Sequence, residues 1–286
     1  MILIDLNQVM ISNLMAQSRG DISELPDKAA VRHSILNTIR AFNVKFKDEF
    51  GTLVCAADAA DPWRRDIFPN YKHQRRKGRV ESKIDWSGVF GIMSEIREEL
   101  TKNMPYKILH VEKCEADDII ATLCAQQTED LYLIVSGDKD FIQLQFYKGV
   151  DQYAPIQKKM VGWDSEAEGI RIDPKEFLLE QIMKGDRSDG IPNILSDDDV
   201  FVTGEKQKPM TKKRIQDMGS LRSIDRQIQA NIDRNVSLID LTKIPQAYED
   251  AIINSYRSYK VNDRSKLLTY FIENKLKSLM ENIGDF

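Results

Sequence analysis

Nine acidic residues have the types and spacing to hold divalent metal ions. Most of them follow short apolar runs, at points where the chain would leave a strand. They are Asp5, Asp58, Glu115, Asp117, Asp118, Asp138, Asp140, Asp186 and Asp189. Carboxylates and water select Mg²⁺ or Mn²⁺ over softer ions. Two such ions roughly 4 Å apart can activate an attacking water and stabilise the leaving oxygen of a phosphodiester, so this chemistry needs no protein nucleophile.

Each acidic motif also has an ordinary structural explanation. A single Asp after a strand, such as Asp5, is most often a helix cap or a turn residue. The acids of residues 115–118 could complement a helix dipole, and those of residues 136–140 could form a capped turn. The order of the motifs favours a metal site, because in an open parallel sheet the first seven acids would share one carboxyl edge. That much negative charge in one place requires a counter-charge.

The positive charge of the chain is concentrated in two segments. The formal net charge is −4, but setting the nine acids aside leaves 36 acidic against 41 basic residues. Residues 63–79 hold a single acid and seven basic residues, namely Arg64, Arg65, Lys72, Arg75, Arg76, Lys77 and Arg79. The second segment holds Lys206, Lys208, Lys212, Lys213 and Arg214. A basic run is more often a solvated helix face, but its position directly after Asp58 favours contact with nucleic acid.

Other residue types restrict the alternatives. The three cysteines form no Cys-x-x-Cys pair and the three histidines share no zinc-ligand spacing, so we expect neither a disulfide nor a zinc site. No apolar run approaches the roughly 20 residues of a membrane-spanning helix. The apolar N-terminus carries Asp5 and lacks a basic flank or a cleavage site, which argues against a signal peptide. We therefore expect a soluble, cytoplasmic protein with no membrane contact.

The elements that must position the acids follow from the apolar pattern. The first half alternates short β-rich runs with helical patterns, which predicts an α/β fold with a largely parallel central sheet flanked by helices. Strands are expected at 2–6, 52–57, 106–111 and 131–136, and helices at 29–50, 86–104 and 116–126. From about residue 174 the pattern is mainly helical, with helices expected at 175–184, 223–235, 246–259 and 265–279. Residues 194–211 are predicted to be a loop.

This pattern predicts two domains, and 286 residues are enough to build them. Residues 1–184 would form the larger domain, which includes the basic segment. Residues 185–286 would form a smaller C-terminal helical domain.

An ordered set of motifs gives the sequence a family resemblance over nearly its whole length. The motifs are Ile4-Asp5-Leu6, Ala57-Asp58, Trp63-Arg-Arg-Asp, Tyr71-Lys-His-Gln-Arg, Glu115-Ala-Asp-Asp, Ser136-Gly-Asp-Lys-Asp-Phe and Lys184-Gly-Asp-Arg-Ser-Asp-Gly-Ile-Pro. With these motifs the chain resembles the 5′-nuclease or flap endonuclease superfamily, and within it the stand-alone ribonuclease H group of T-even-type phages. Any one motif is weak, whereas the ordered set is specific.

The resemblance implies that all nine acids surround two Mg²⁺ ions, for which Mn²⁺ can substitute. The acids nearer the first ion would be Asp5, Asp58, Glu115, Asp117 and Asp138, and those nearer the second Asp140, Asp186 and Asp189, with Asp118 serving either. The resemblance also implies that residues at about 62–84 form a basic helical arch. Lys72 and Arg75 would reach from this arch toward the scissile phosphate and stabilise its developing charge. Replacing Asp138 by Asn is expected to remove catalysis.

The resemblance also implies how nucleic acid would be bound. A 5′ single strand would pass through or beneath the arch, where Arg64, Arg65, Arg76, Lys77 and Arg79 would contact phosphates without reading sequence. Tyr71 would either stack on a base or pack as an aromatic anchor of the arch. Relatives hold a potassium ion in a glycine-rich hairpin, but here the acidic run 197–199 takes its place, so we expect no K⁺ site. Duplex binding is assigned instead to Lys206, Lys208, Lys212, Lys213 and Arg214.

The implied function is removal of RNA primers and adjacent DNA during phage replication in the host cytoplasm. Its substrates would be 5′-flap, nicked or forked DNA and RNA/DNA hybrids. We expect a monomer that works beside replication partners such as a single-strand binding protein or a sliding clamp.

Three other functions compete with this interpretation. A toxin-type ribonuclease also clusters acids but lacks the arch and the helical tail. A phosphatase of the aspartyl-phosphate class needs a second Asp two residues after the first, where this chain has Asn7. A non-catalytic DNA-binding scaffold needs the basic segments but not the nine acids, so Asp138→Asn would leave its function intact.

Overall fold

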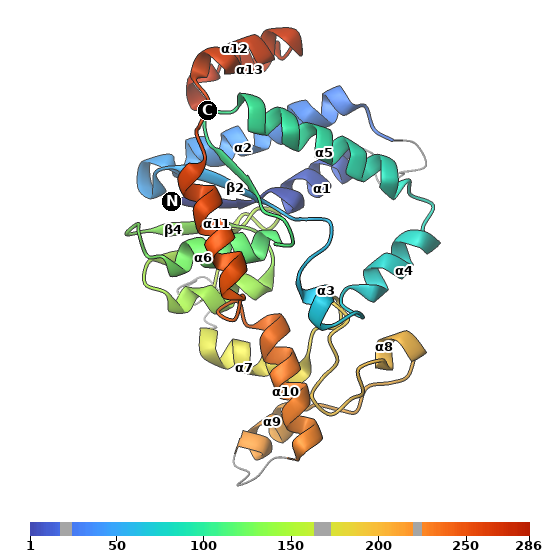
Figure 1. The fold of residues 1–286 in the computed structure, drawn as a ribbon. Coiled ribbons are helices and arrows are strands. Elements are labelled where there is room, and N and C mark those ends of the chain that lie inside the picture. Colours follow the sequence, from blue (N-terminus) through green and yellow to red (C-terminus); the bar gives the residue numbers. More distant parts are fainter. Residues whose placement is uncertain (18–24, 163–172, 220–224) are drawn as a thin grey trace.

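A six-stranded sheet with helices on both faces forms the body of the protein (Figure 1). The computed structural model describes residues 1–17, 25–162, 173–219 and 225–286. The strand order is β3-β2-β1-β4-β5-β6, and all neighbours are parallel except the last pair. The strands are β1 (Ile2–Asp5), β2 (Leu53–Ala57), β3 (Lys107–His110), β4 (Tyr132–Val135), β5 (Val150–Ala154) and β6 (Lys159–Val161). The predicted α/β fold with a largely parallel sheet is confirmed.

The two faces of the sheet are covered by separate hydrophobic cores, because successive side chains of a strand point to opposite sides. Ile2 and Ile4 pack into the first core, together with α1 (Leu6–Gln17), α2 (Lys28–Phe50) and α5 (Trp86–Asn103). Leu3 packs into the second core, with α6 (Ala116–Ala125) and the 3-10 helix η1 (Lys139–Phe146). All four residues of β1 are buried, as expected for a strand covered on both faces.

Acidic caps set the beginnings of three helices close to the predicted positions. The Asp27 side chain accepts hydrogen bonds from the first amides of α2, and the Asp85 side chain accepts one from Gly88 in α5. Asp173 does the same at the start of α7 (Pro174–Lys184). Such caps satisfy backbone donors that have no partner within the helix. These three aspartates lie outside the acidic cluster, and their role is to cap helices.

The arch, residues 62–84, connects the sheet to α5. It contains α3 (Arg64–Ile67) and α4 (His73–Glu81), and α4 has no buried residue. In Figure 1, α4 runs between α5 above and the lower lobe below, at the side of the molecule. The expected helical arch is therefore present.

The lower lobe has its own small core, built around Met183, Ile194 and Met218. Its helices are α7 (Pro174–Lys184), α8 (Val200–Thr203), α9 (Lys212–Gly219) and α10 (Arg226–Ile239). The predicted loop 194–211 therefore contains one short helix, α8. The first residues of the helix predicted at 223–235 lie outside the described part of the chain; α10 begins at Arg226, after the Asp225 cap, and extends to Ile239.

The last helices do not stay with this lobe, which differs from the predicted division at residue 185. They are α11 (Gln246–Ser258), α12 (Arg264–Glu273), α13 (Lys277–Met280) and the 3-10 helix η2 (Ile283–Asp285). Ile252 of α11 is buried in the second sheet core, and Leu267 and Phe271 of α12 in the first. Their apolar stripes are covered by the sheet domain, so only about residues 174–240 form a separate lobe. The helix predicted at 265–279 is interrupted at Lys275, whose φ is 55°.

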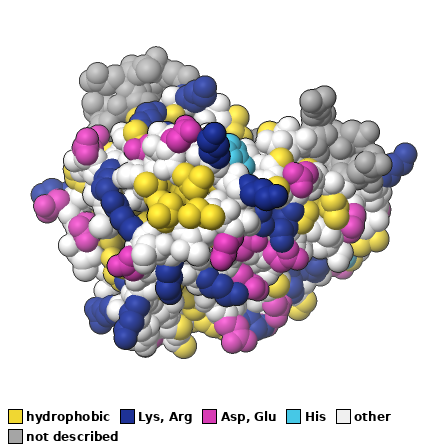
Figure 2. Space-filling model, turned by 90° about the horizontal axis from the view of Figure 1, so that it is seen from above, with side chains coloured by type: hydrophobic (Ala, Val, Ile, Leu, Met, Phe, Trp, Pro, Cys, Tyr) yellow, Lys and Arg dark blue, Asp and Glu magenta, His cyan; other side chains and the backbone are white. Residues whose placement is uncertain are grey.

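The surface carries charges of both signs on the face seen in Figure 2, where Lys and Arg alternate with Asp and Glu around a small hydrophobic area. In the described ranges, no helix is long and apolar enough to span a bilayer.

Candidate active site

The carboxyl ends of the parallel strands bring the predicted acids together. Asp5 ends β1, Asp58 follows β2, residues 115–118 begin α6, and Asp138 caps η1 after β4. The strand order reverses between β1 and β4, and ligands of open parallel sheets bind at such a point. Charges within the cluster act on one another: Asp138 raises the pKa of Asp5, Asp117 and Asp140. Asp186 and Asp189 also raise the pKa of Asp140, so the turn after α7 belongs to the same cluster.

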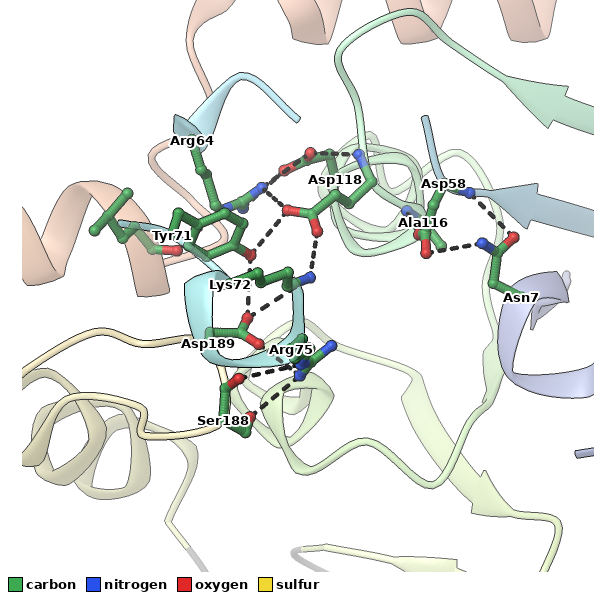
Figure 3. Close-up of polar contacts among 12 residues, drawn as sticks. Asn7, Asp58, Arg64, Tyr71, Lys72, Arg75, Ala116, Asp118, Ser188 and Asp189 are labelled. Carbon is green, nitrogen blue, oxygen red and sulfur yellow. Dashed lines mark hydrogen bonds and ion pairs between the residues drawn. The ribbon is translucent and has the colours of Figure 1, made fainter. Parts of the chain in front are cut away.

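Polar side chains that the sequence analysis missed hold Asp5 and Asp58 in place. Asp5 accepts hydrogen bonds from the Gln8 amide at 3.0 Å and the Ser136 hydroxyl at 3.2 Å. Asp58 accepts from the Asn7 side chain at 2.9 Å and from the Ala116 amide at 2.8 Å (Figure 3). Asn7 and Gln8 lie two and three residues after Asp5, and Ser136 precedes Gly137-Asp138, so their places beside the motifs were the available signal.

The base of the arch is tied to the acids by Lys72 and Arg75 (Figure 3). The Lys72 ammonium donates to Glu115 and lies 3.7 Å from Asp189. Arg75 pairs with Asp189 at 2.5 Å and donates to the Ser188 carbonyl at 3.1 Å. Both predicted arch cations therefore reach the acidic cluster. Burial opposes the charge on Lys72, but Glu115 and Asp189 outweigh this effect and raise its pKa.

Arg64 does not face solvent, which corrects its expected role as a phosphate contact. Its side chain is buried and pairs with Asp118 at 2.8 Å and Glu115 at 3.2 Å. It also donates to the Leu238 carbonyl at 2.9 Å. Trp63 donates to Asp118 as well, at 3.1 Å. Arg64 is therefore a buried counter-ion that joins the arch to α6 and α10.

Asp118 is correspondingly closed to a metal ion, which contradicts its predicted place in the metal site. The residue is fully buried, and its carboxylate accepts hydrogen bonds from Arg64, Trp63 and the Glu115 amide. The last of these bonds is half of a capping box with Glu115 at the start of α6. Asp118 thus positions the helix and balances Arg64.

Tyr71 is likewise buried, with 3% of its surface exposed, so of its two predicted roles only that of a packed anchor fits. Its hydroxyl lies 2.9 Å from Glu115 and 3.1 Å from Asp189. Its ring packs with Phe68, Ile191, Leu238 and Ile239. No base could stack on a ring enclosed in this way.

The turn after α7 needs glycine at two positions, and it meets the arch at the second of them. Gly185 has φ +66°, and a Cβ there would lie 2.3 Å from the Ile191 carbonyl oxygen. Gly190 has φ +73° and lies against the backbone of Asn70. Lys72, with φ 56°, donates its amide to the Asp189 carbonyl at 2.6 Å. A left-handed non-glycine residue at a functional site stores strain that surrounding contacts must hold, here the link between turn and arch.

Within the described ranges, several acids of the cluster have no basic side chain paired with them. Burial and the neighbouring Asp58 raise the pKa of Asp5 to about 7, and burial and Asp138 raise the pKa of Asp140 to about 7. Burial and Asp138 also raise the pKa of Asp117 well above its ordinary value. Burial works the same way on Glu115, but Lys72 and Arg64 hold its pKa below normal. The sheet-edge acids are the ones that still require positive charge.

The donor set and the space between the acids suit hydrated magnesium. A void of about 10 Å³ is lined by the acids Asp117, Asp140, Asp186 and Asp189, which gives room for one water or one ion. Among the described residues, no three His, Cys, Asp or Glu side chains converge as direct ligands of one ion. Mg²⁺ keeps several of its waters and so needs only one or two direct carboxylates, with the others reached through water.

Beside the acids lies a cleft of about 520 Å³ between the arch, α1 and α5. Asp58, Glu115 and Lys72 line one part of it, and Arg65, Arg75, Arg76 and Arg79 line the arch side. Lys77 is exposed on α4 and does not line the cleft. Four of the predicted arch arginines thus face one space, next to the acids.

The C-terminal basic segment lies apart, on the lower lobe. Lys206 and Lys208 follow α8, and Lys212, Lys213 and Arg214 begin α9. All five side chains are exposed. The lobe therefore presents a basic surface that is separate from the cleft.

Comparison with known proteins places the chain in a family. The family described as 5′-3′ exonuclease, N-terminal resolvase-like domain, matches residues 1–177, and the one described as T4 RNase H, C terminal, matches residues 174–286. Ribonuclease H of Enterobacteria phage T4 is 33% identical over 303 residues, covering 99% of this chain and 95% of that protein. DNA polymerase I of Rhizobium leguminosarum is 31% identical over 138 residues, which cover 48% of this chain and 13% of the polymerase.

Solved structures share the fold at low sequence identity. The phage T5 5′-exonuclease with bound zinc ions has a TM-score of 0.60 at 15% identity, covering 99% of both chains. The phage T5 flap endonuclease with DNA and metal ions has the same TM-score and identity, covering 99% of this chain and 98% of that one. The family matches extend over the whole chain and include the acids and the arch. The chain therefore belongs to the 5′-3′ exonuclease family and is a 5′ nuclease.

Proposed function

We propose that the protein is a divalent-metal-dependent, structure-specific nuclease that removes RNA primers and adjacent DNA from 5′ ends. Its substrates would be 5′-flap, nicked or forked DNA and RNA/DNA hybrids. The observation that carries this proposal is the group of sheet-edge acids whose pKa burial and neighbouring acids raise; one of them, Asp58, lines a cleft together with five arginines. In replication it would act as a monomer beside a single-strand binding protein and a sliding clamp.

The relatives support the substrate class. The T4 protein is a ribonuclease H, and the T5 flap endonuclease structure contains DNA and metal ions. The cleft of this chain fits a single strand, because its arginines offer charge-assisted contacts to successive phosphates without reading bases. The exposed basic surface of α9 would then hold the adjoining duplex.

Two Mg²⁺ ions would be held by Asp5, Asp58, Asp117, Asp138, Asp140, Asp186 and Asp189, with Glu115 at the side of the arch and Mn²⁺ as a substitute. When bound, such ions lower the pKa of a coordinated water and stabilise the leaving oxygen. Asn7, Gln8 and Ser136 orient the carboxylates. Lys72 and Arg75 stand next to the same acids and would stabilise the charge that develops on the phosphate. Without a substrate, their pairing with Glu115 and Asp189 keeps these cations in place.

The test is cleavage of a 5′-labelled flap duplex and of an RNA/DNA hybrid, with Mg²⁺ and with chelator. Wild type should give metal-dependent short 5′ products, and Asp138→Asn should lose them. Asp48→Asn, which changes an exposed acid on α2, is the matched control and should cleave normally. If both substrates are bound but neither is cut by wild type, the protein is a binding scaffold and the proposal is wrong.

A further inference from the structure

The cleft beside the acids continues beyond the residues assigned so far. The part of it along α5, which we term the inner end, is lined by Arg97 of α5, His110 at the end of β3, and the apolar side chains of Met10, Phe90 and Met93. These residues lie outside both the arch and the acidic motifs. The cleft therefore has lining residues that the reacting phosphate and its arch contacts do not account for.

Among the residues that the structure describes, positive charge exceeds negative charge around the cleft. Five arginines and Lys72 line it there, with two carboxylates, Asp58 and Glu115. In the part of the chain that the structure describes, Arg97 has no carboxylate partner and donates one hydrogen bond, to the Ser94 hydroxyl at 3.2 Å. Burial lowers its pKa, so the surroundings disfavour the charge that the guanidinium carries. A half-buried guanidinium of this kind is completed by an anion.

An apolar surface lies next to this charge. Met10 and Met93 are buried, whereas the Phe90 ring is 37% exposed. That ring contacts Trp86, at 5.7 Å between centroids, and the Arg79 guanidinium, 4.8 Å from the Phe90 centroid. Aromatic faces fixed beside arginines accept bases of any sequence by stacking. Phosphate and base contacts are thus offered side by side.

We propose that the inner end of the cleft is a subsite for one nucleotide of the 5′ single strand, with Arg97 bound to its phosphate and Phe90 against its base. The proposal rests on the proposed function, since it assigns a second contact to the same strand. The strand would be held on both sides of the arch, by Lys72 and Arg75 near the reacting phosphate and by Arg97 beyond it. Arg97 is here a binding residue that fixes how far the strand extends into the cleft.

The contact should affect binding only of substrates that carry a single-stranded 5′ tail. Arg97→Gln keeps a long side chain in α5 and removes the charge, and Arg257→Gln, at an exposed position on α11 outside the cleft, is the matched control. Binding in chelator is compared for a blunt duplex and for the same duplex with a 5′ tail that ends in phosphate or hydroxyl. The 5′-labelled products formed with Mg²⁺ are sized in parallel.

We expect Arg97→Gln to weaken binding of tailed duplex by roughly ten- to a hundredfold, as for removal of a hydrogen bond to a charged group, and to leave blunt duplex unchanged. Phe90→Ala should weaken both tails equally. A loss confined to phosphate-ended tails would assign Arg97 to the terminal phosphate, and an equal loss for both tails to an internal phosphodiester. The product lengths should change in either case.

The subsite is refuted if Arg97→Gln binds tailed duplex as Arg257→Gln does, or weakens blunt and tailed duplex equally. Either result could coexist with normal cleavage by wild type, in which case the proposed function stands and only the subsite is wrong. If wild type cuts no 5′ substrate, the proposed function itself is wrong.

Discussion

Two parts of the acidic cluster differ in how their charge is balanced, although they meet at the neighbouring residues Asp117 and Asp118. On the arch side, Glu115 and Asp118 are paired with Arg64 and Lys72. At the sheet edge, acids such as Asp5 and Asp117 have their pKa raised by burial and by one another. We propose that the acids paired with the buried Arg64 hold the fold together, and that the sheet-edge acids bind the metal ions.

The largest expected effect tests the arch side. Arg64→Met should lower the free energy of unfolding by about 3–5 kcal/mol, because Asp118 would remain buried without its cation. Arg65→Met is the control, since Arg65 pairs with the exposed Asp61 and should change stability by less than about 1 kcal/mol. Urea unfolding of both variants measures the difference. Equal losses would show that the buried pair has no special role.

The sheet edge should respond in the opposite direction. Asp5→Asn removes one charge from a cluster of carboxylates that repel one another. Without metal, the variant should therefore be more stable than wild type by about 1–2 kcal/mol. With Mg²⁺ it should gain less stability than wild type and cleave about 10²–10³-fold more slowly, a loss typical for one stabiliser of transition-state charge. Unfolding in chelator and in Mg²⁺, together with cleavage rates, gives all three values. A variant that is less stable in chelator would contradict the account.

The dependence on pH should sharpen the same contrast. In the folded protein Asp5 and Asp140 have pKa values of about 7, against about 4 in an unfolded chain. Between pH 4 and 7 the folded state therefore binds more protons, and metal-free stability falls as pH rises, by up to about 1.4 kcal/mol per pH unit and group. Mg²⁺ removes this penalty, so the rise in Tm with Mg²⁺ should be larger at pH 8 than at pH 5.5. A rise that is the same at both pH values would mean that these acids do not bind the ion.

The smallest effect is expected far from the cluster. Changing Lys212 and Lys213 to Gln should weaken binding of blunt duplex less than about tenfold and reduce its salt dependence, by about 0.9 in slope for each phosphate that is no longer neutralised. Lys47→Gln on the exposed side of α2 serves as the control. Unchanged duplex binding would remove α9 from the proposed interface. Binding titrations over a range of salt concentrations measure both quantities.

The sequence predicted the acids better than the basic residues, for a physical reason. Parallel strands all end at one edge, so Asp5, Asp58 and Asp138 had to meet once the strands were identified. A run of basic residues says nothing about which side chain turns inward, and Arg64 was assigned to solvent although it is buried against Asp118. The same residue explains the wrong prediction for Asp118, because pairing with the buried Arg64 makes Asp118 a structural acid.

The course of the C-terminal helices was also beyond sequence reasoning. The apolar spacing of α11 and α12 correctly predicted amphipathic helices, but an apolar stripe does not specify the surface that covers it. Leu267 and Phe271 pack into the sheet domain and not into the lower lobe. The inner end of the cleft was missed for a similar reason, because Met10, Phe90 and Arg97 come from segments that only the fold brings together.

The most direct test of the account compares two adjacent acids, Asp117 and Asp118. Asp117→Asn should abolish Mg²⁺-dependent cleavage of a 5′-flap duplex while stability in chelator is kept or increased. Asp118→Asn should lower stability by about 1–3 kcal/mol, because Arg64 loses its buried partner, and should keep cleavage at temperatures where it is folded. If Asp118→Asn is folded but inactive, or Asp117→Asn cleaves normally, the division between neutralised and metal-binding acids is wrong.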